Sequence, residues 1–270
     1  MQVPRTLCMH WSGRLSSGVG AKDMMLHMIG RFGMNGGQYQ AVEFSGEAVM
    51  ALSMPERMTL SNMSAEMGAQ AGLIAADETT VAHLRQCGVS EDRLQDALHW
   101  RGDAGAGQER FDFDAGSLSP QVAAPHSPAN VHPVGDLREV APTIAYIGAC
   151  TGAKLEDLRA AASVLRGHKV ASDVQLIVAP ASARDQAQAE REGTMQVLRD
   201  AGAVVLGNSC GACAGYGATF GEGATVISST ARNFKGRMGS ASVQVYLASP
   251  WTVAASALHG RIADPREVLA

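Results

Sequence analysis

Apolar residues follow two distinct patterns along the second half of the chain. Short continuous apolar runs, typical of buried strands, occur at 143–149, 173–179, 203–207 and 224–228. In other segments apolar residues recur every three or four positions, which predicts helices at 155–166, 184–201 and 251–258. Strands that alternate with helices predict a mostly parallel sheet covered on both faces, in a three-layer αβα arrangement.

The first half of the chain is less regular and ends in a proline-rich segment. The run 40–44 predicts a strand, and the patterns at 21–30, 64–72 and 78–87 predict helices. Five prolines lie between residues 115 and 142, and because proline interrupts helices and central strands we expect a surface linker there. The sequence therefore predicts an α/β protein with a partial N-terminal α/β domain (1–114), a linker (115–142) and a C-terminal αβα domain (143–270).

Composition and charge narrow the class of protein. Apolar residues make up 46% of the 270 positions and charged residues 18%, which allows a sizeable core and argues against global disorder. The net charge of −4 comes without a basic stripe, so we expect neither a nucleic-acid nor an anionic membrane partner. The N-terminus lacks the apolar core of a signal peptide, and no apolar run is long enough to span a bilayer. A cytoplasmic protein is therefore expected.

Three of the five cysteines follow predicted strands. Cys150 comes directly after the first strand of the C-terminal domain, and Cys210 and Cys213 follow the third. Because ligands bind beyond the carboxyl ends of strands in open parallel sheets, these three thiols are expected to meet at one edge. In a reducing cytoplasm they are expected as thiols or metal ligands rather than as disulfides.

The segment after the fourth predicted strand should open onto the same edge. It carries Arg232, Lys235 and Arg237, whose side chains suit carboxylates, the arginine fork in particular. The residues alone leave four interpretations of the three cysteines open: an iron–sulfur cluster, a zinc site completed by a histidine, a redox C-x-x-C pair, or buried thiols without a special role. The other two cysteines, Cys8 and Cys87, match no motif and are expected to be packing residues.

Several segments, in order along the chain, resemble the aconitase superfamily. Residues 149–159 resemble the segment that presents the first cluster cysteine, 210–213 resemble its C-x-x-C motif and 231–237 its arginine loop. Upstream, 61–69 resemble a segment whose Asn and Glu face the cluster, and 246–257 resemble the end of the family. Within the superfamily, the likeness is closest to the large subunits of isopropylmalate dehydratase and homoaconitase.

The resemblance implies a cofactor, an activity and a set of site residues. It implies a [4Fe–4S] cluster on Cys150, Cys210 and Cys213, with a fourth iron left open to substrate. It implies further site residues with roles in hydrogen bonding near the cluster, in proton handling and in carboxylate binding: Asn62, Glu66, Arg232 and Arg237. The implied reaction is the reversible dehydration and rehydration of a hydroxy di- or tricarboxylic acid, such as 3-isopropylmalate or homocitrate, in amino-acid biosynthesis. A separate small subunit would carry the swivelling domain.

Each of these residues also has an ordinary structural interpretation. Glu66 could be a solvated helical carboxylate, Asn62 a helix N-cap, and 232–237 a solvated turn. The chain also departs from the family pattern, because Gly152 and Ala231 stand where the family usually has Asn.

The family's N-terminal Asp-Ser-His-Thr region has no counterpart, so those residues are expected on another polypeptide or lost. A catalytically degenerate or truncated relative that acts as an assembly partner is therefore the alternative function. An iron-sensing, RNA-binding relative is a further alternative, against which the acidic balance argues.

Overall fold

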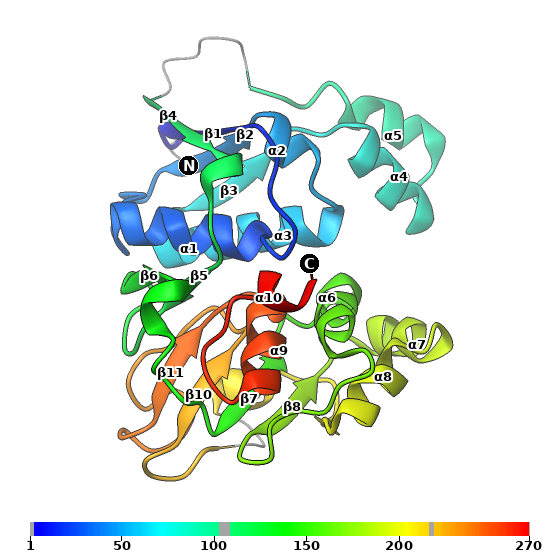
Figure 1. Cartoon of the computed structure of the whole chain (residues 1–270). Helices are drawn as coiled ribbons and strands as arrows, with labels where there is room; N and C mark the ends of the chain where they lie inside the picture. Colours follow the sequence, from blue (N-terminus) through cyan, green and yellow to red (C-terminus); the bar gives the residue numbers. More distant parts are fainter. Residues whose placement is uncertain (1–2, 103–108, 216–218, 270) are drawn as a thin grey trace.

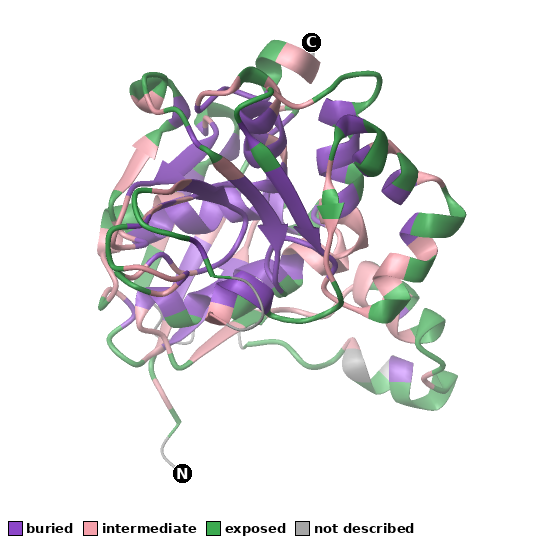
Figure 2. Cartoon of the chain, turned by 90° about the horizontal axis from the view of Figure 1, so that it is seen from below, coloured by how far each residue is buried: buried purple, intermediate pink, exposed green. Residues whose placement is uncertain are grey.

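The computed structural model describes residues 3–102, 109–215 and 219–269. Two β-sheets lie one above the other, with α1 (Ala21–Phe32) and α3 (Met54–Met63) between them (Figure 1). Figure 2 shows buried residues concentrated in the central strands and helices, and exposed residues in the peripheral helices and loops. None of the described helices is long and apolar enough to cross a membrane.

The first sheet is parallel throughout and has the strand order β3-β2-β1-β4. Its strands are β1 (Thr6–Ser12), β2 (Ala41–Ser45), β3 (Ala71–Ile74) and β4 (Glu109–Asp114). Side chains alternate between its two faces. Apolar side chains of one face, such as Met9 and Phe44, share a core with α1 (Ala21–Phe32) and α3 (Met54–Met63). The alternate positions are mainly polar, among them His10.

The second sheet has seven strands in the order β6-β5-β11-β10-β7-β8-β9. Its parallel strands are β7 (Ile144–Gly148), β8 (Gln175–Ala179), β9 (Val204–Val205), β10 (Thr225–Ser228) and β11 (Gln244–Leu247). The strands β5 (Gln121–Ala123) and β6 (Val131–Pro133) extend it in antiparallel orientation. The carboxyl ends of β7, β9 and β10 therefore lie on one edge, as expected for a parallel arrangement.

The two faces of the second sheet are covered differently. The helices α6 (Leu155–Leu165), α8 (Thr194–Ala201) and α9 (Pro250–His259) share one core with alternate strand residues. The other face packs against loop residues such as Met238 and the short η4 (Gly211–Ala214), in the same core as the N-terminal helices.

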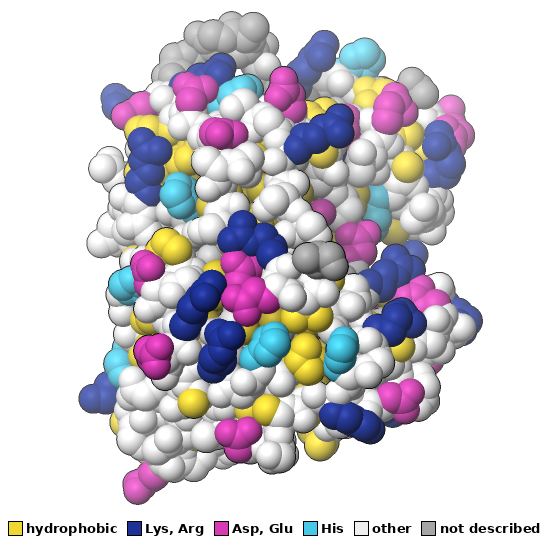
Figure 3. Space-filling model, in the orientation of Figure 1, with side chains coloured by type: hydrophobic (Ala, Val, Ile, Leu, Met, Phe, Trp, Pro, Cys, Tyr) yellow, Lys and Arg dark blue, Asp and Glu magenta, His cyan; other side chains and the backbone are white. Residues whose placement is uncertain are grey.

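Short elements complete the described chain. They are α2 (Glu47–Met50), η1 (Ser64–Met67), α4 (Glu78–Gln86), α5 (Glu91–Ala97), η2 (Ala115–Ser117), η3 (Val134–Leu137), α7 (Ala183–Arg191) and α10 (Arg266–Leu269). The α/β class with mostly parallel sheets is confirmed. Acidic and basic side chains are interspersed over the face shown in Figure 3.

Three predicted elements differ from those observed. The helix predicted at 184–201 is two helices, because Gly193 adopts a left-handed conformation with φ of 82°. The helix predicted at 64–72 is wrong: η1 ends at the left-handed Gly68, and β3 follows. The proline-rich segment is not only a surface linker, since β5 and β6 join the second sheet and residues 121–124 are buried. Pro133 is tolerated because β6 is an edge strand. The division into domains stays a prediction.

Candidate functional site

The turn that carries Cys150 follows β7 directly. Ala149 has a positive φ of 68°, which turns the chain sharply at the end of the strand. The buried Ser229, just after β10, holds this turn: its hydroxyl accepts from the Gly148 N–H at 3.0 Å and donates to the Gly152 carbonyl at 2.9 Å. The loops after β7 and β10 are therefore joined by one side chain.

The same contact explains why position 152 holds a glycine. A Cβ at Gly152 would lie 2.3 Å from the carbonyl oxygen of Ser229 and 2.4 Å from its hydroxyl. No side chain fits there while Ser229 holds its position. The departure from the family's asparagine is thus accommodated by the geometry of the turn.

The helix α3 belongs to the N-terminal half of the chain, which contains the first sheet. It faces the Cys150 turn, which belongs to the C-terminal half with the second sheet. Asn62 lies near its end and donates from Nδ2 to Cys150 Sγ at 3.6 Å. Lys154 adds a second bridge, because its Nζ donates to Thr59 Oγ1 at 2.8 Å and to the Cys150 carbonyl at 3.0 Å. Since the N-cap of α3 is Ser53, the interpretation of Asn62 as an N-cap is wrong.

Glu66 and Arg232 form a second link between the two halves. Glu66 lies in η1, and its side chain is only 2% exposed, so it is not a solvated carboxylate. Its Oε1 accepts a hydrogen bond from Nε of Arg232, whose side chain is 43% exposed. Its Oε2 is buried and has no hydrogen-bond partner within the described residues. One carboxylate oxygen is thus left for another group.

Cys210 and Cys213 lie in a short turn after β9. The Cys213 N–H donates to the Cys210 carbonyl at 2.9 Å; Cys210 is exposed, whereas Cys213 is buried. Tyr146 of β7 lies against this turn, since a Cβ at Gly211 would approach its hydroxyl to 2.6 Å. Burial raises the pKa of Tyr146 to about 12, and Cys213 and Cys210 act in the same direction. The strand that ends at the Cys150 turn therefore also contacts the C-x-x-C turn.

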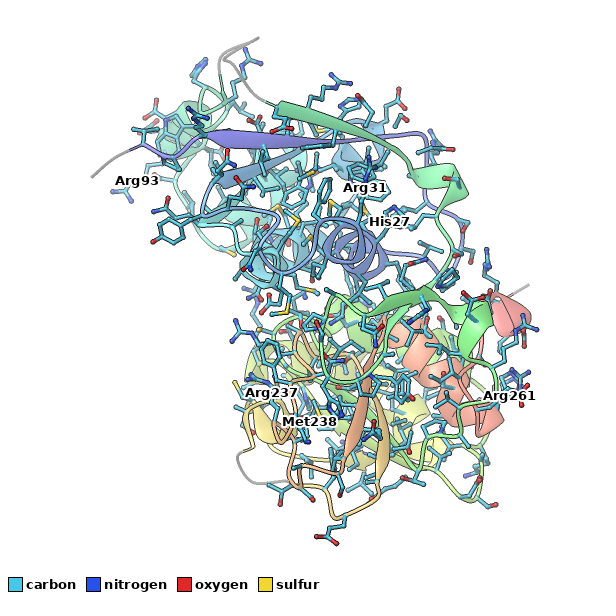
Figure 4. The ribbon with its side chains drawn as sticks, turned by 90° about the vertical axis from the view of Figure 1, so that its left-hand side faces the viewer. His27, Arg31, Arg93, Arg237, Met238 and Arg261 are labelled. Carbon is cyan, nitrogen blue, oxygen red and sulfur yellow. The ribbon has the colours of Figure 1, made fainter. Side chains whose placement is uncertain are left out.

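Arg237 is placed by the segment that follows Arg232. Figure 4 shows it in the C-terminal half of the molecule, beside Met238. A Cβ at Gly215, which ends η4, would lie 3.3 Å from the Arg237 carbonyl, so the arginine segment borders the C-x-x-C turn. The Nε of Arg237 is buried without a hydrogen-bond partner among the described side chains and backbone.

The structure thus groups the predicted residues in pairs. Asn62 meets Cys150, and Glu66 meets Arg232. In the described ranges, no three His, Cys, Asp or Glu side chains are grouped closely enough to hold a single metal ion. The three cysteines do not form a compact single-ion site, which argues against the zinc interpretation.

Sequence reasoning missed three residues that shape this region: Lys22, Tyr146 and Ser229. The signal for Lys22 was available, because a Lys-Asp pair opens a helix that is otherwise mainly apolar. Cys8 is buried, as expected, but the prediction for Cys87 is wrong, because it is exposed. Its Sγ lies 3.8 Å from Nε2 of His83 and from a guanidinium nitrogen of Arg184.

Comparisons with known proteins agree with the resemblance. Residues 1–260 match the family profile described as the aconitase family (aconitate hydratase). The 3-isopropylmalate dehydratase large subunit of Oleidesulfovibrio alaskensis is 42% identical over 269 residues, which are 98% of this chain and 62% of that protein. The corresponding subunit of Picrophilus torridus is also 42% identical, over 99% of this chain and 63% of its own length.

A third relative and one solved structure complete the comparison. The probable methanogen homoaconitase large subunit of Methanosarcina mazei is 44% identical over 99% of this chain and 67% of its own length. The solved structure of holo aconitase X from Thermococcus kodakaraensis matches with a TM-score of 0.43 and 12% identity, over 89% of this chain and 53% of that one. This chain spans about 62% of the length of the first relatives it matches. On the sequence evidence, the chain belongs to the aconitase family.

Proposed function

We propose that this chain is part of the large subunit of an iron–sulfur hydro-lyase. The proposed reaction is the reversible dehydration and rehydration of a hydroxy di- or tricarboxylic acid such as 3-isopropylmalate or homocitrate. The observation that carries the proposal is the pair of links across the two halves, Asn62 to Cys150 and Glu66 to Arg232. The names of the relatives support the same reaction class.

The cofactor in this proposal is a [4Fe–4S] cluster on Cys150, Cys210 and Cys213. Thiolates are the usual ligands of such clusters, and a hydrogen bond to a ligand sulfur, as from Asn62, is a known way to tune them. Three buried polar atoms of the residues placed in this region have no hydrogen-bond partner among the described residues: Glu66 Oε2, Tyr146 Oη and Arg237 Nε. This donor set fits a bound polar group. When bound, the cluster would supply Lewis-acid iron that helps hydroxide to leave.

The protein side chains have separate tasks in this proposal. Arg232 is held through Nε by Glu66, which leaves its half-exposed terminal nitrogens to donate to a substrate carboxylate. The free Oε2 of the buried Glu66 can accept a proton or orient a water molecule. Arg237 is proposed to support the carboxylate-binding loop.

The proposal also includes a partner. The relatives named above are large subunits, so we expect a separate small subunit that carries the swivelling domain. A noncatalytic assembly role is the second candidate, favoured by the turn at Gly152, where Ser229 leaves no space for the family's asparagine.

The first test is the iron and acid-labile sulfide content after anaerobic reconstitution. We expect about four of each per wild-type chain, loss of both in Cys150→Ser, and no change in Cys87→Ser, whose thiol contacts His83 and Arg184. Iron at background in the wild type would contradict the cluster. If the cluster forms, hydration of the unsaturated acids with a candidate small subunit separates a catalytic from a noncatalytic role.

A further inference from the structure

Lys22 is a buried lysine at the contact between the two halves of the molecule. It lies in the first turn of α1, and its side chain is 3% exposed. A cation there faces the positive end of the helix dipole and has also lost its water, and both effects are unfavourable. A Cβ at the neighbouring Gly20 would lie 2.7 Å from the ring of Trp251 in α9, so the start of α1 is packed tightly against the C-terminal half. Such a lysine needs strong partners.

Its partners are two backbone carbonyls of the loop after β10. The Nζ of Lys22 donates to the Ser229 carbonyl at 2.8 Å and to the Thr230 carbonyl at 2.5 Å. The Ser229 carbonyl also accepts from Thr151 Oγ1 at 3.4 Å. The ammonium group therefore fixes the backbone at residues 229 and 230. Ser229 bonds to the Cys150 turn, and Arg232 follows two residues after Thr230.

The charges around Lys22 come from the same site. Burial lowers its pKa to about 8, whereas Asp157, Cys213 and Glu66 raise it and Lys154 lowers it. A pKa of about 8 leaves the group mostly protonated at neutral pH. Two of the three groups that raise its pKa, Cys213 and Glu66, belong to the proposed site.

We propose that Lys22 is a positioning residue of this site, which fixes the loop 229–232 against the Cys150 turn and places a positive charge within electrostatic range of Cys213. The inference rests on the proposed function for its cofactor, but the positioning itself is a property of the chain alone. The lysine acts through Ser229 and Thr230, from a helix of the opposite half. Lys22 thus supplies hydrogen-bond donors and a positive charge from outside the two loops.

The test begins with backbone amide exchange of the metal-free chain, measured by mass spectrometry. In Lys22→Met we expect exchange in segments 146–154 and 226–233 to become faster on the order of tenfold, with strands of the first sheet unchanged. Lys169→Met is the matched control, because Lys169 also donates to a backbone carbonyl, that of Asp200, but is exposed. Unchanged exchange in both segments, or an equal increase throughout the chain, would overturn the proposal.

The second readout is the midpoint potential of the reconstituted cluster in a dithionite titration. A nearby positive charge favours the reduced, more negative state, so Lys22→Met should lower the potential, whereas Lys22→Arg and Lys169→Met should keep it close to wild type. An equal potential in Lys22→Met and wild type would overturn the electrostatic part. If Lys22→Met does not fold, Lys22→Leu, which also has neither charge nor donor, takes its place in both measurements with the same expected outcomes.

The two proposals can fail separately. Wild-type protein without iron after reconstitution contradicts the proposed hydro-lyase, and amide exchange of the metal-free chain then decides alone whether Lys22 fixes the two segments. A wild-type cluster whose potential and amide exchange do not respond to Lys22→Met contradicts the positioning role and leaves the proposed function standing.

Discussion

The two cysteine-bearing segments are held in different ways. The Cys150 turn is fixed by two residues from distant parts of the chain, Ser229 from the loop after β10 and Asn62 from α3. The nearby Lys154 bonds to the Cys150 carbonyl and also to Thr59 of α3. The contacts of Asn62 and Thr59 depend on the packing of the two halves, whereas those of Ser229 depend on the pairing of β7 with β10. This segment can have its observed shape only in the folded protein.

The C-x-x-C turn is held mainly by its own residues. Its hydrogen bonds are local, from the Cys213 N–H to the Cys210 carbonyl and from the Gly211 N–H to Ser209 Oγ at 3.1 Å. The strand before it, β9, has only two residues. We therefore expect substitutions around Cys150 to lower the free energy of unfolding, and matched substitutions around Cys210 to leave it nearly unchanged.

The largest effect is expected from Asp23, next to Lys22. The carboxylate accepts from the Gly20 N–H at 2.9 Å and from the Gln121 N–H at 2.8 Å, and burial raises its pKa to about 7. Between about pH 4 and pH 7 the native state thus binds a proton that the unfolded state has lost, so stability falls as the pH rises. The full contribution is on the order of 4 kcal/mol.

Urea unfolding at several pH values checks this prediction. The difference in unfolding free energy between wild type and Asp23→Asn should change across this window, because Asn cannot titrate. Groups with lowered pKa values, such as Asp77 and Asp264, act in the opposite direction but are common to both proteins. Parallel pH profiles for the two proteins would show that Asp23 titrates normally.

The next largest loss of stability is expected from a glycine in the Cys150 turn, in contrast to a glycine before the C-x-x-C turn. Gly152→Ala places a Cβ against the backbone oxygen of Ser229, so we expect a loss of about 3 kcal/mol, near the upper end for overpacking. Gly207→Ala, which precedes the C-x-x-C turn, meets no atom within 4 Å and should change stability by less than about 0.5 kcal/mol. Denaturant midpoints with equal slopes measure both. Equal losses would remove the contrast between the segments.

A matched pair of serines gives a smaller contrast. Ser229→Ala leaves the buried Gly148 N–H without its acceptor, which should cost about 1 to 2 kcal/mol. Ser209→Ala also removes an acceptor, that of the Gly211 N–H, but Ser209 is exposed and water can replace it, so the loss should stay below about 0.5 kcal/mol. Thermal and urea unfolding of both variants test the difference, and a Ser229 variant as stable as wild type would contradict it.

The two sheets differ in how far their strands could be predicted from the sequence. The main strands of the second sheet are buried on both faces and appear as continuous apolar runs, so β7, β8 and β10 were found. In the first sheet one face is polar, and β1 alternates between residues such as Met9 and His10. The hydrophobic pattern of the first sheet is therefore weaker, and the sequence does not predict β1. Two further elements, α3 and β11, are also not predicted. The break at Gly193 depends on a left-handed backbone that the helical pattern does not reveal.

For the site, sequence reasoning reached the residues that belong to local motifs. The cysteines and arginines follow strand ends, and their positions can be expected from the alternation of strands and helices. Lys22 and Ser229 could not be found in this way. Lys22 bonds to backbone 207 and 208 residues away, and Ser229 to backbone 81 and 77 residues away, so no side-chain pattern records their partners. The contacts of Lys22 and Ser229 become visible only in the folded chain.

The smallest effect is expected from Tyr146, which borders the C-x-x-C turn. Its hydroxyl is buried near the Ala212 amide but lacks a well-formed hydrogen bond among the described residues, and its ring packs in the core. Tyr146→Phe keeps the ring and removes a polar group that gains little from burial, so the unfolding free energy should change by less than about 0.5 kcal/mol or rise slightly. Urea unfolding of the metal-free chain measures it. A loss of more than about 1 kcal/mol would mean that the hydroxyl holds this turn through a full hydrogen bond, and that the second cysteine segment is fixed by the strand β7 as firmly as the first.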